Sequence, residues 1–100
     1  MLDTVVLRVL CDGDNYGFGI MQHLMSRLGD DGAVLKGSTV YPLLHRLEDR
    51  GYVESYWRSG KRGTDRKYYR ITKAGRACLT QRKKDWRQVA RIVRRLVLSH

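Results

Sequence analysis

The sequence predicts an α+β domain that is mostly α-helical, with three short helices, a two-stranded hairpin and one long C-terminal helix. Apolar residues recur at helical spacing in four segments, and a glycine follows each of the first three. Between the third and fourth segments, aromatic and β-branched residues flank a run of turn-forming residues, which is typical of a hairpin. With 100 residues, the chain has room for one hydrophobic core.

The first two helices are expected to be short and joined by a tight turn. An apolar stripe covers residues 2–12 and stops at Gly13, which ends the first helix. Asp14 or Asn15 is expected to cap the second helix, because both side chains can accept hydrogen bonds from free backbone N–H groups. Gly29 ends this second helix.

A third helix follows a loop in which residues 33–36 are expected to form a very short strand. Ser38 or Thr39 is expected to cap this helix, and Gly51 ends it. Pro42 is compatible with the helix if it falls in or at the edge of the first turn. The residues of the expected core stripe are Val40, Leu43, Leu44 and Leu47.

The hairpin and the last helix occupy the second half of the chain. Residues 52–58 and 67–71 are the predicted strands, and the turn-forming residues 59–65 make a long basic tip between them. Thr72 is expected to cap a final helix that runs to about Leu98. Five of the six heptad core positions of this helix are apolar, which favours a seam against another helix.

This seam predicts a homodimer, because a small three-helix core has no further surface with which to cover it. The first helix is expected to contribute to the same interface. The predicted dimerisation residues are Leu2, Val6, Leu79, Trp86, Val89, Val93 and Leu96.

The charge of the chain points to a polyanionic partner. Twenty Lys and Arg against ten Asp and Glu give a formal net charge of +10. Residues 1–57 carry a net charge of −3, residues 58–71 of +5 and residues 72–100 of +8, so the basic character lies in the second half. The two cysteines, Cys11 and Cys78, form no CxxC motif, and a reduced cytoplasm fits best. No signal peptide or membrane span is expected.

The order of these elements is that of a winged helix-turn-helix, in which the third helix enters the major groove of DNA and the hairpin, or wing, meets the adjacent backbone. Residues 1–71 are assigned to this DNA-binding unit and residues 72–100 to a C-terminal dimerisation helix within the same compact domain. The predicted DNA-binding residues are Lys36, Ser38, Thr39, Tyr41, Pro42, His45, Arg46, Lys61, Arg62, Arg66 and Lys67.

Several motifs resemble those of the PadR family of transcriptional regulators. They are YGFGI at 16–20, GSTVYPLLHRLE at 37–48, GYV at 51–53, and KYYRIT at 67–72 followed by Gly75. The resemblance implies a homodimer in which the C-terminal helix packs against the partner, chiefly its N-terminal helix. It also implies a repressor of an inverted-repeat operator in double-stranded DNA, usually released by a small molecule or chemical signal.

Trp86 and Val89 are candidate effector-binding residues. In some members of the family that the chain resembles, planar aromatic molecules stack on tryptophan between the subunits. The resemblance makes Met21 and Met25 further candidates for lining such a space. The alternative is that Trp86 only packs, since a tryptophan on a helical seam buries a large apolar area.

The sequence leaves two other classes of function open. A nonspecific basic nucleic-acid-binding protein and a protein-interaction winged helix remain alternatives. The loop that begins at Asp12 lacks calcium ligands at the required positions, and Gly60-Lys61 is not followed by Ser or Thr, so no phosphate-binding loop is expected. The histidines share no ligand spacing and no catalytic constellation is evident. We therefore expect no enzyme activity, no metal and no cofactor.

Overall fold

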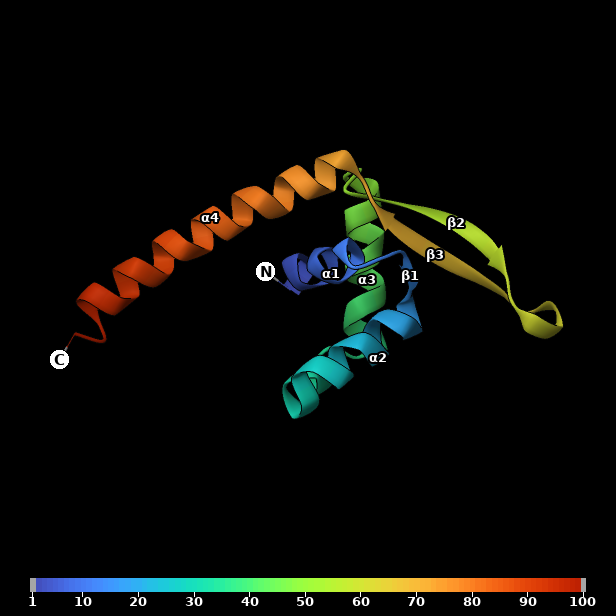
Figure 1. Ribbon diagram of the computed structural model, residues 1–100, viewed down its shortest axis with the longest axis horizontal. Coiled ribbons are helices and arrows are strands. Elements are labelled where there is room, and N and C mark those ends of the chain that lie inside the picture. The colour runs from blue at the N-terminus through green and yellow to red at the C-terminus, as the bar shows by residue number, and fades with distance from the viewer. Residues whose placement is uncertain (1, 100) are drawn as a thin grey trace.

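The computed structural model describes residues 2–99, and its elements follow the order shown in Figure 1. The predicted DNA-binding unit (1–71) begins at Met1 and the predicted dimerisation helix (72–100) ends at His100. These two terminal residues lie outside the described residues. In chain order the elements are α1 (Leu2–Cys11), β1 (Asn15–Tyr16), α2 (Gly17–Leu28), η1 (Gly29–Val34), α3 (Gly37–Asp49), β2 (Val53–Ser59), η2 (Lys61–Gly63), β3 (Asp65–Ile71) and α4 (Lys73–Leu96).

The hydrophobic core lies where α1, α2 and α3 meet the base of the sheet. Leu7 and Leu10 of α1 and Leu44 and Leu47 of α3 are among its fully buried side chains. The predicted stripe of α3 is buried throughout, which fixes the opposite face of this helix toward solvent. The core therefore positions α3 for contact with a partner molecule.

The sheet has three antiparallel strands in the order β1-β3-β2. The hairpin is in register from Val53 opposite Ile71 at its base to Ser59 opposite Asp65 near its tip. Only the base is covered by the core, and the distal half projects away from the helices (Figure 1). This projection gives the hairpin the reach of a wing.

The start of α2 differs from the prediction. Neither Asp14 nor Asn15 caps the helix. Its N-cap is Tyr16, which has an extended backbone. The reason is that Asn15 and Tyr16 form β1, pairing with Tyr69 and Tyr68 of β3. A pairing with a strand fifty residues further along the chain holds these residues out of the helix.

Residues 33–36 do not form the expected short strand. The chain forms the 3-10 helix η1 over Gly29–Val34 and then the turn that leads into α3. Gly32 packs so closely on α2 that a Cβ atom there would lie 2.9 Å from the carbonyl oxygen of Leu24. The segment folds back onto α2 and has no sheet edge beside it.

The beginning of α3 also corrects the prediction. Lys36 is the N-cap, and its carbonyl accepts hydrogen bonds from the N–H groups of Thr39 and Val40 at 2.9 and 2.8 Å. Ser38 and Thr39 are therefore inside the helix and do not cap it. Pro42 is the sixth helical residue, so it lies beyond the first turn, and its missing N–H leaves one helical hydrogen bond unmade.

Thr72 caps α4 as predicted, because its hydroxyl accepts a hydrogen bond from the N–H of Gly75 at 3.1 Å. The helix ends at Leu96, slightly before the expected Leu98. Its first half packs against α1, and its second half extends away from the core in the direction opposite to the hairpin (Figure 1). No helix among residues 2–99 is long and apolar enough to cross a membrane.

Two of the predicted dimerisation residues have no surface to offer a partner. Val6 is 0% exposed and Leu79 is 4% exposed, because both side chains are enclosed by their own subunit. The assignment of these two residues to a subunit interface is therefore corrected. Leu2 and the seam residues from Trp86 onward are exposed.

Candidate nucleic-acid interface

The exposed face of α3 carries the side chains that the sequence analysis assigned to DNA. Ser38, Tyr41, Pro42, His45 and Arg46 are exposed. Thr39 is half-buried, and Lys36 is exposed at the N-cap. No side chain caps the helix, which leaves backbone N–H groups at its positive end free for an anion.

A cleft of about 370 Å³ separates α3 from β3. Tyr41 and His45 line it from α3, and Arg66 and Lys67 line it from the hairpin. The structure thus brings together four of the predicted DNA-binding residues from segments about twenty residues apart in sequence. Lys61 and Arg62 lie apart from them, in η2 at the hairpin tip.

Tyr41 is held in place by the N-terminus of α2. Its ring lies on Gly17, where a Cβ atom would collide with the ring carbons, and it also lies 3.4 Å from the Cβ position of Gly37. Gly17 is therefore required for the close approach of the two helices, and it leaves Tyr41 45% exposed. The phenol group is fixed by packing while one side of it stays accessible.

The outer face of the sheet carries alternating tyrosine rings and guanidinium groups. Arg66 lies over the ring of Tyr16, 4.5 Å from its centroid, and Arg58 lies 5.2 Å from the centroid of Tyr68. The rings of Tyr56 and Tyr68 stack at 5.9 Å. These contacts hold the guanidinium groups in defined positions on this face, and Arg66 also lines the cleft.

Acidic side chains hold the base of this face. Tyr56 donates a 2.6 Å hydrogen bond to Asp14, and this bond raises the pKa of the Tyr56 phenol above its ordinary value. Arg70 forms a 2.8 Å ion pair with Glu54. The cation at the base of this face is thus neutralised, whereas among the described residues Arg58 and Arg66, nearer the tip, have no carboxylate within ion-pair distance.

Lys67 differs from the other predicted contacts because it already has an acidic partner. Its ammonium group lies 3.6 Å from Glu48 of α3, which also accepts a hydrogen bond from Ser55 of β2. Glu48 therefore joins α3 to both strands of the hairpin. This contact fixes the position of the wing relative to α3 and reduces the charge that Lys67 offers to a phosphate.

The sequence analysis missed Arg58, Tyr16 and Tyr69 as parts of this surface. Arg58 lies opposite Arg66 in the hairpin register, a position that the symmetry of the two strands about Lys61-Arg62 could have indicated. Tyr16 and Tyr69 line the cleft because β1 pairs with β3. No local sequence pattern indicates a strand of two residues, so the sequence does not predict that Tyr16 and Tyr69 line the cleft.

A second hollow surrounds the candidate effector residues. Trp86 borders a groove of about 530 Å³ between α1, α2 and α4, and Trp86 and Val89 together border a neighbouring hollow of about 280 Å³. Met21 and Met25 line neither hollow, which corrects that expectation. The helix α2 presents a different stripe to the groove, including Leu24 and Leu28.

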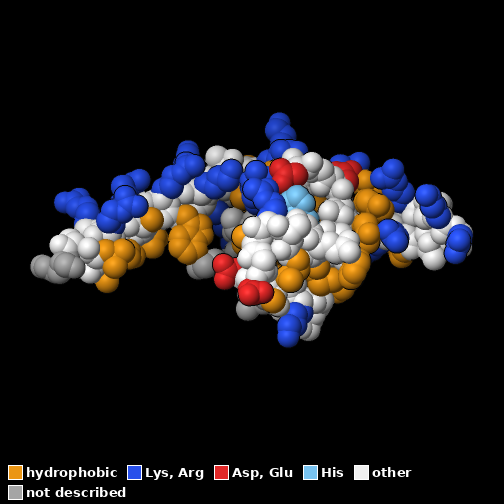
Figure 2. Space-filling model, turned by 60° about the horizontal axis from the view of Figure 1, so that its bottom comes forward, with side chains coloured by type: hydrophobic (Ala, Val, Ile, Leu, Met, Phe, Trp, Pro, Cys, Tyr) orange, Lys and Arg blue, Asp and Glu red, His pale blue; other side chains and the backbone are white. Residues whose placement is uncertain are grey.

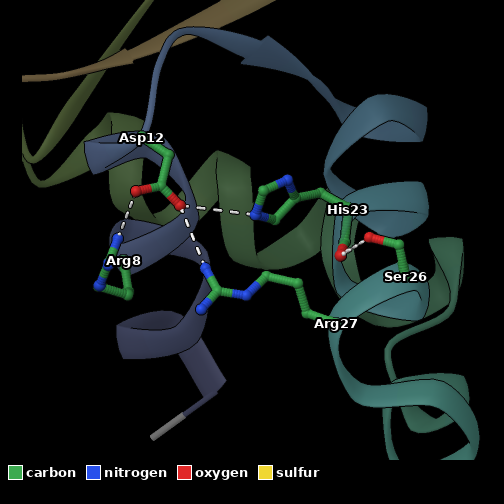
Figure 3. A network of polar contacts seen from close by, with 5 residues as sticks. All are labelled: Arg8, Asp12, His23, Ser26 and Arg27. Atoms are coloured by element: carbon green, nitrogen blue, oxygen red, sulfur yellow. Dashed lines mark hydrogen bonds and ion pairs between the residues drawn. The ribbon is translucent and has the colours of Figure 1, made fainter.

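The rim of this groove is charged (Figure 3). Asp12 accepts a 2.8 Å hydrogen bond from Arg8 of α1 and lies 3.5 Å from His23 and 3.4 Å from Arg27 of α2. The hydrogen bond from Arg8 lowers the pKa of the Asp12 carboxyl below its ordinary value. One carboxylate thus links α1 to α2 at the mouth of an otherwise apolar groove.

Neither a metal site nor a disulfide forms among residues 2–99. No group of three potential metal ligands gathers there, and Cys11 and Cys78 are both free and half-buried.

Comparison with known proteins assigns the chain to a family. Residues 6–81 match the transcriptional regulator PadR-like family. The transcriptional regulator Rv3488 of Mycobacterium tuberculosis is 35% identical over 88 residues, which are 88% of this chain and 78% of that protein.

Solved structures agree with this assignment. A transcriptional regulator from Clostridium thermocellum has a TM-score of 0.80 and 34% identity, over 95% of this chain and 91% of that one. A PadR family transcription regulator from Clostridium difficile has a TM-score of 0.80 and 28% identity, over 95% of this chain and 96% of that one. The predicted fold class and the predicted resemblance are both confirmed. With a fold shared along nearly its whole length and a family match over residues 6–81, the chain belongs to the PadR-like family of transcriptional regulators.

Proposed function

We propose that two copies of this chain bind an inverted-repeat operator in double-stranded DNA and repress transcription. Each subunit lays the N-terminal half of α3 in the major groove and its hairpin against neighbouring phosphates. The observation that carries the proposal is the cleft in which Tyr41 and His45 lie beside Arg66 and Lys67. It joins side chains suited to base edges with cations suited to the DNA backbone.

The exposed seam of α4 supports the dimer. Large apolar side chains follow one another along the half of the helix that leaves the core, and soluble monomers rarely expose a continuous patch of this kind. These residues are Trp86, Val89, Ile92, Val93, Leu96, Val97 and Leu98. A second copy of α4 is a suitable cover, because the same stripe can pack against itself about a two-fold axis.

The affinity for DNA is expected to depend strongly on salt. If a dimer makes about eight phosphate contacts, the slope of log affinity against log salt is near −7, and affinity falls roughly 10⁴-fold between 50 and 200 mM salt. The variant Lys61→Ala/Arg62→Ala is expected to weaken binding to all sequences about equally, because both residues lie at the hairpin tip, away from the cleft. Fluorescence anisotropy with an operator selected from a random duplex pool measures both effects.

Variants of α3 provide the matched control. Tyr41→Ala and Arg46→Ala are expected to lower the preference for the operator over random duplex, because these exposed side chains face away from the core. An operator preference that survives both substitutions, or an affinity that does not change with salt, contradicts the proposal. If the unmodified protein and all variants show only a weak preference for the operator over random duplex, the chain is a nonspecific basic nucleic-acid-binding protein.

We further propose that a planar aromatic molecule binds beside Trp86 and releases the operator. Trp86 is 42% exposed and lies between the two hollows, so a flat ring can stack on the indole without displacing the core. Thr4 also borders both hollows, and its hydroxyl oxygen is buried and has no hydrogen-bond partner among the described residues. Such a ligand acts only through its different affinities for two dimer geometries.

The expected result is quenching of Trp86 fluorescence together with a loss of operator affinity. A loss of about 20-fold corresponds to about 1.8 kcal/mol of coupling. A panel of flat aromatic compounds is titrated against Trp57→Phe, in which Trp86 is the only tryptophan. The control is Trp86→Phe, which retains only Trp57, on the distant hairpin. If no compound quenches Trp86 while DNA binding is intact, Trp86 is a packing residue.

A further inference from the structure

The outer face of α4 carries a row of cations that the proposed DNA interface does not use. We define the basic stripe as Lys83, Lys84, Arg87, Arg91, Arg94 and Arg95, all of which are exposed. Among the described residues, none of the six has a carboxylate within ion-pair distance. Figure 2 shows blue side chains along one edge of α4 and hydrophobic side chains along the opposite edge.

The stripe stays accessible when the seam is covered. At 3.6 residues per turn, its six residues fall within about a third of the helix circumference, centred about 120–140° from Trp86 and Val93. Lys83, at one end of this arc, also borders the groove beside Trp86. A partner helix packed on the apolar edge therefore leaves the basic edge in solvent. The stripe also lies at the other end of the molecule from the hairpin tip, since α4 and the hairpin project in opposite directions (Figure 1).

A face that served only solubility would not need this arrangement. Lys83 and Arg87, Arg87 and Arg91, and Arg91 and Arg95 are each four residues apart, and like charges at this spacing destabilise a helix. Asp85, the only acidic residue of α4, is hydrogen-bonded to Gln81 and pairs with none of them. An anion that neutralises the row relieves this repulsion.

The composition and spacing of the stripe fit the phosphates of a duplex. Four of its six residues are arginines, whose planar guanidinium group binds phosphate through two hydrogen bonds. From Lys83 to Arg95 the helix rises about 18 Å. Over that length a DNA strand winds about half a turn around the duplex axis, so the six cations face the several phosphates that lie on the near side of the duplex.

We propose that the basic stripe of α4 is a second, sequence-independent binding surface for the phosphate backbone of duplex DNA. The inference rests on the proposed function only in naming DNA as the polyanion this regulator meets. Contact with the stripe uses no side chain of α3 or the hairpin. It adds nonspecific affinity that is independent of operator recognition.

The test uses the full-length protein in a background that weakens the first surface, Lys61→Gln/Arg62→Gln. In this background, Arg87→Gln/Arg91→Gln is expected to reduce affinity for a random 24-base-pair duplex about 10-fold or more at 100 mM salt and to make the salt slope less negative by about 1.8. Glutamine keeps the helix, which circular dichroism checks. The control is Arg50→Gln, which removes a charge from an exposed site outside the stripe that has no ion pair among the described residues, and it is expected to have less than a twofold effect.

The outcomes separate this proposal from the proposed function. If the variant of the stripe binds random duplex as tightly as the control variant, the proposal is wrong. It is also overturned if the substitutions abolish binding to phosphatidylserine vesicles and leave binding to duplex unchanged. If the proposed function is wrong, the unmodified protein shows no preference for any DNA sequence. The effect of the stripe on binding to random duplex can still be measured in that case.

Discussion

Replacement of Gly75 by alanine is expected to destabilise the protein by about 3 kcal/mol, which lowers Tm by roughly 15 °C in a domain of this size. A Cβ atom at this position would collide with the carbonyl oxygen of Tyr52 and lie 2.8 Å from Cγ1 of Ile71. The Tyr52 carbonyl cannot move freely, because it accepts a hydrogen bond from the N–H of Thr72 at 3.0 Å. The methyl group therefore forces α4 away from the turn between α3 and β2.

This expected loss of stability is opposite in sign to the usual effect of the same substitution in a helix. Within an ordinary helix, glycine to alanine stabilises by about 1 kcal/mol. The matched substitution is Ala77→Gly, at an exposed position of the same helix, where a loss of about 1 kcal/mol is expected from helix propensity. Thermal and urea unfolding measure both variants. If Gly75→Ala proves as stable as the unmodified protein, α4 does not pack on this turn as described.

Val93→Asp is expected to separate the dimer into monomers at micromolar concentration and to lower affinity for a two-half-site operator by about 100-fold or more. The side chain of Val93 lies on the exposed apolar edge of α4, where a partner helix would bury the new carboxylate without a counter-charge. A monomer binds each half-site independently and loses the advantage of linked binding. Light scattering and anisotropy measure the two effects.

Two controls accompany this variant. Gln88→Asp introduces the same charge outside the apolar seam of α4 and is expected to leave the dimer intact. Affinity for a single half-site is expected to be unchanged by Val93→Asp, because α3 and the hairpin are distant from this residue. A Val93→Asp protein that remains dimeric shows that the seam is not the subunit interface.

The periodic spacing of apolar residues predicted those helices and strands that bury one apolar face in the core. The stripe of α3 from Val40 to Leu47 is buried as expected, and the hairpin strands differ from their predicted bounds by at most two residues at either end. In these elements the burial of alternate or every third and fourth residue is the main source of stability, and it is visible in one sequence.

Contacts between distant segments account for what the sequence did not reveal. Asn15 and Tyr16 have the composition of a helix cap and its first turn, and only the edge of β3 makes them a strand. Val6 shares the apolar edge of α1 with exposed Leu2, and only the packed core distinguishes the buried residue from the exposed one. The same holds for the cleft, where α3 and β3 are brought together by Glu48 and its partners.

The backbone of Arg62 has a consequence for how the hairpin meets a duplex. This residue has a φ of 63°, in the left-handed region that glycine adopts readily and arginine does not. The conformation costs roughly 1 kcal/mol, which a glycine at the same place would avoid. Hydrogen bonds from the N–H of Gly60 to the Thr64 carbonyl at 2.6 Å and from the Thr64 hydroxyl to the Lys61 carbonyl at 2.8 Å close the tip around this residue, whereas the base is fixed by Val53, Ile71 and the core. The turn therefore presents a guanidinium group to a duplex at the place where a glycine would present only backbone.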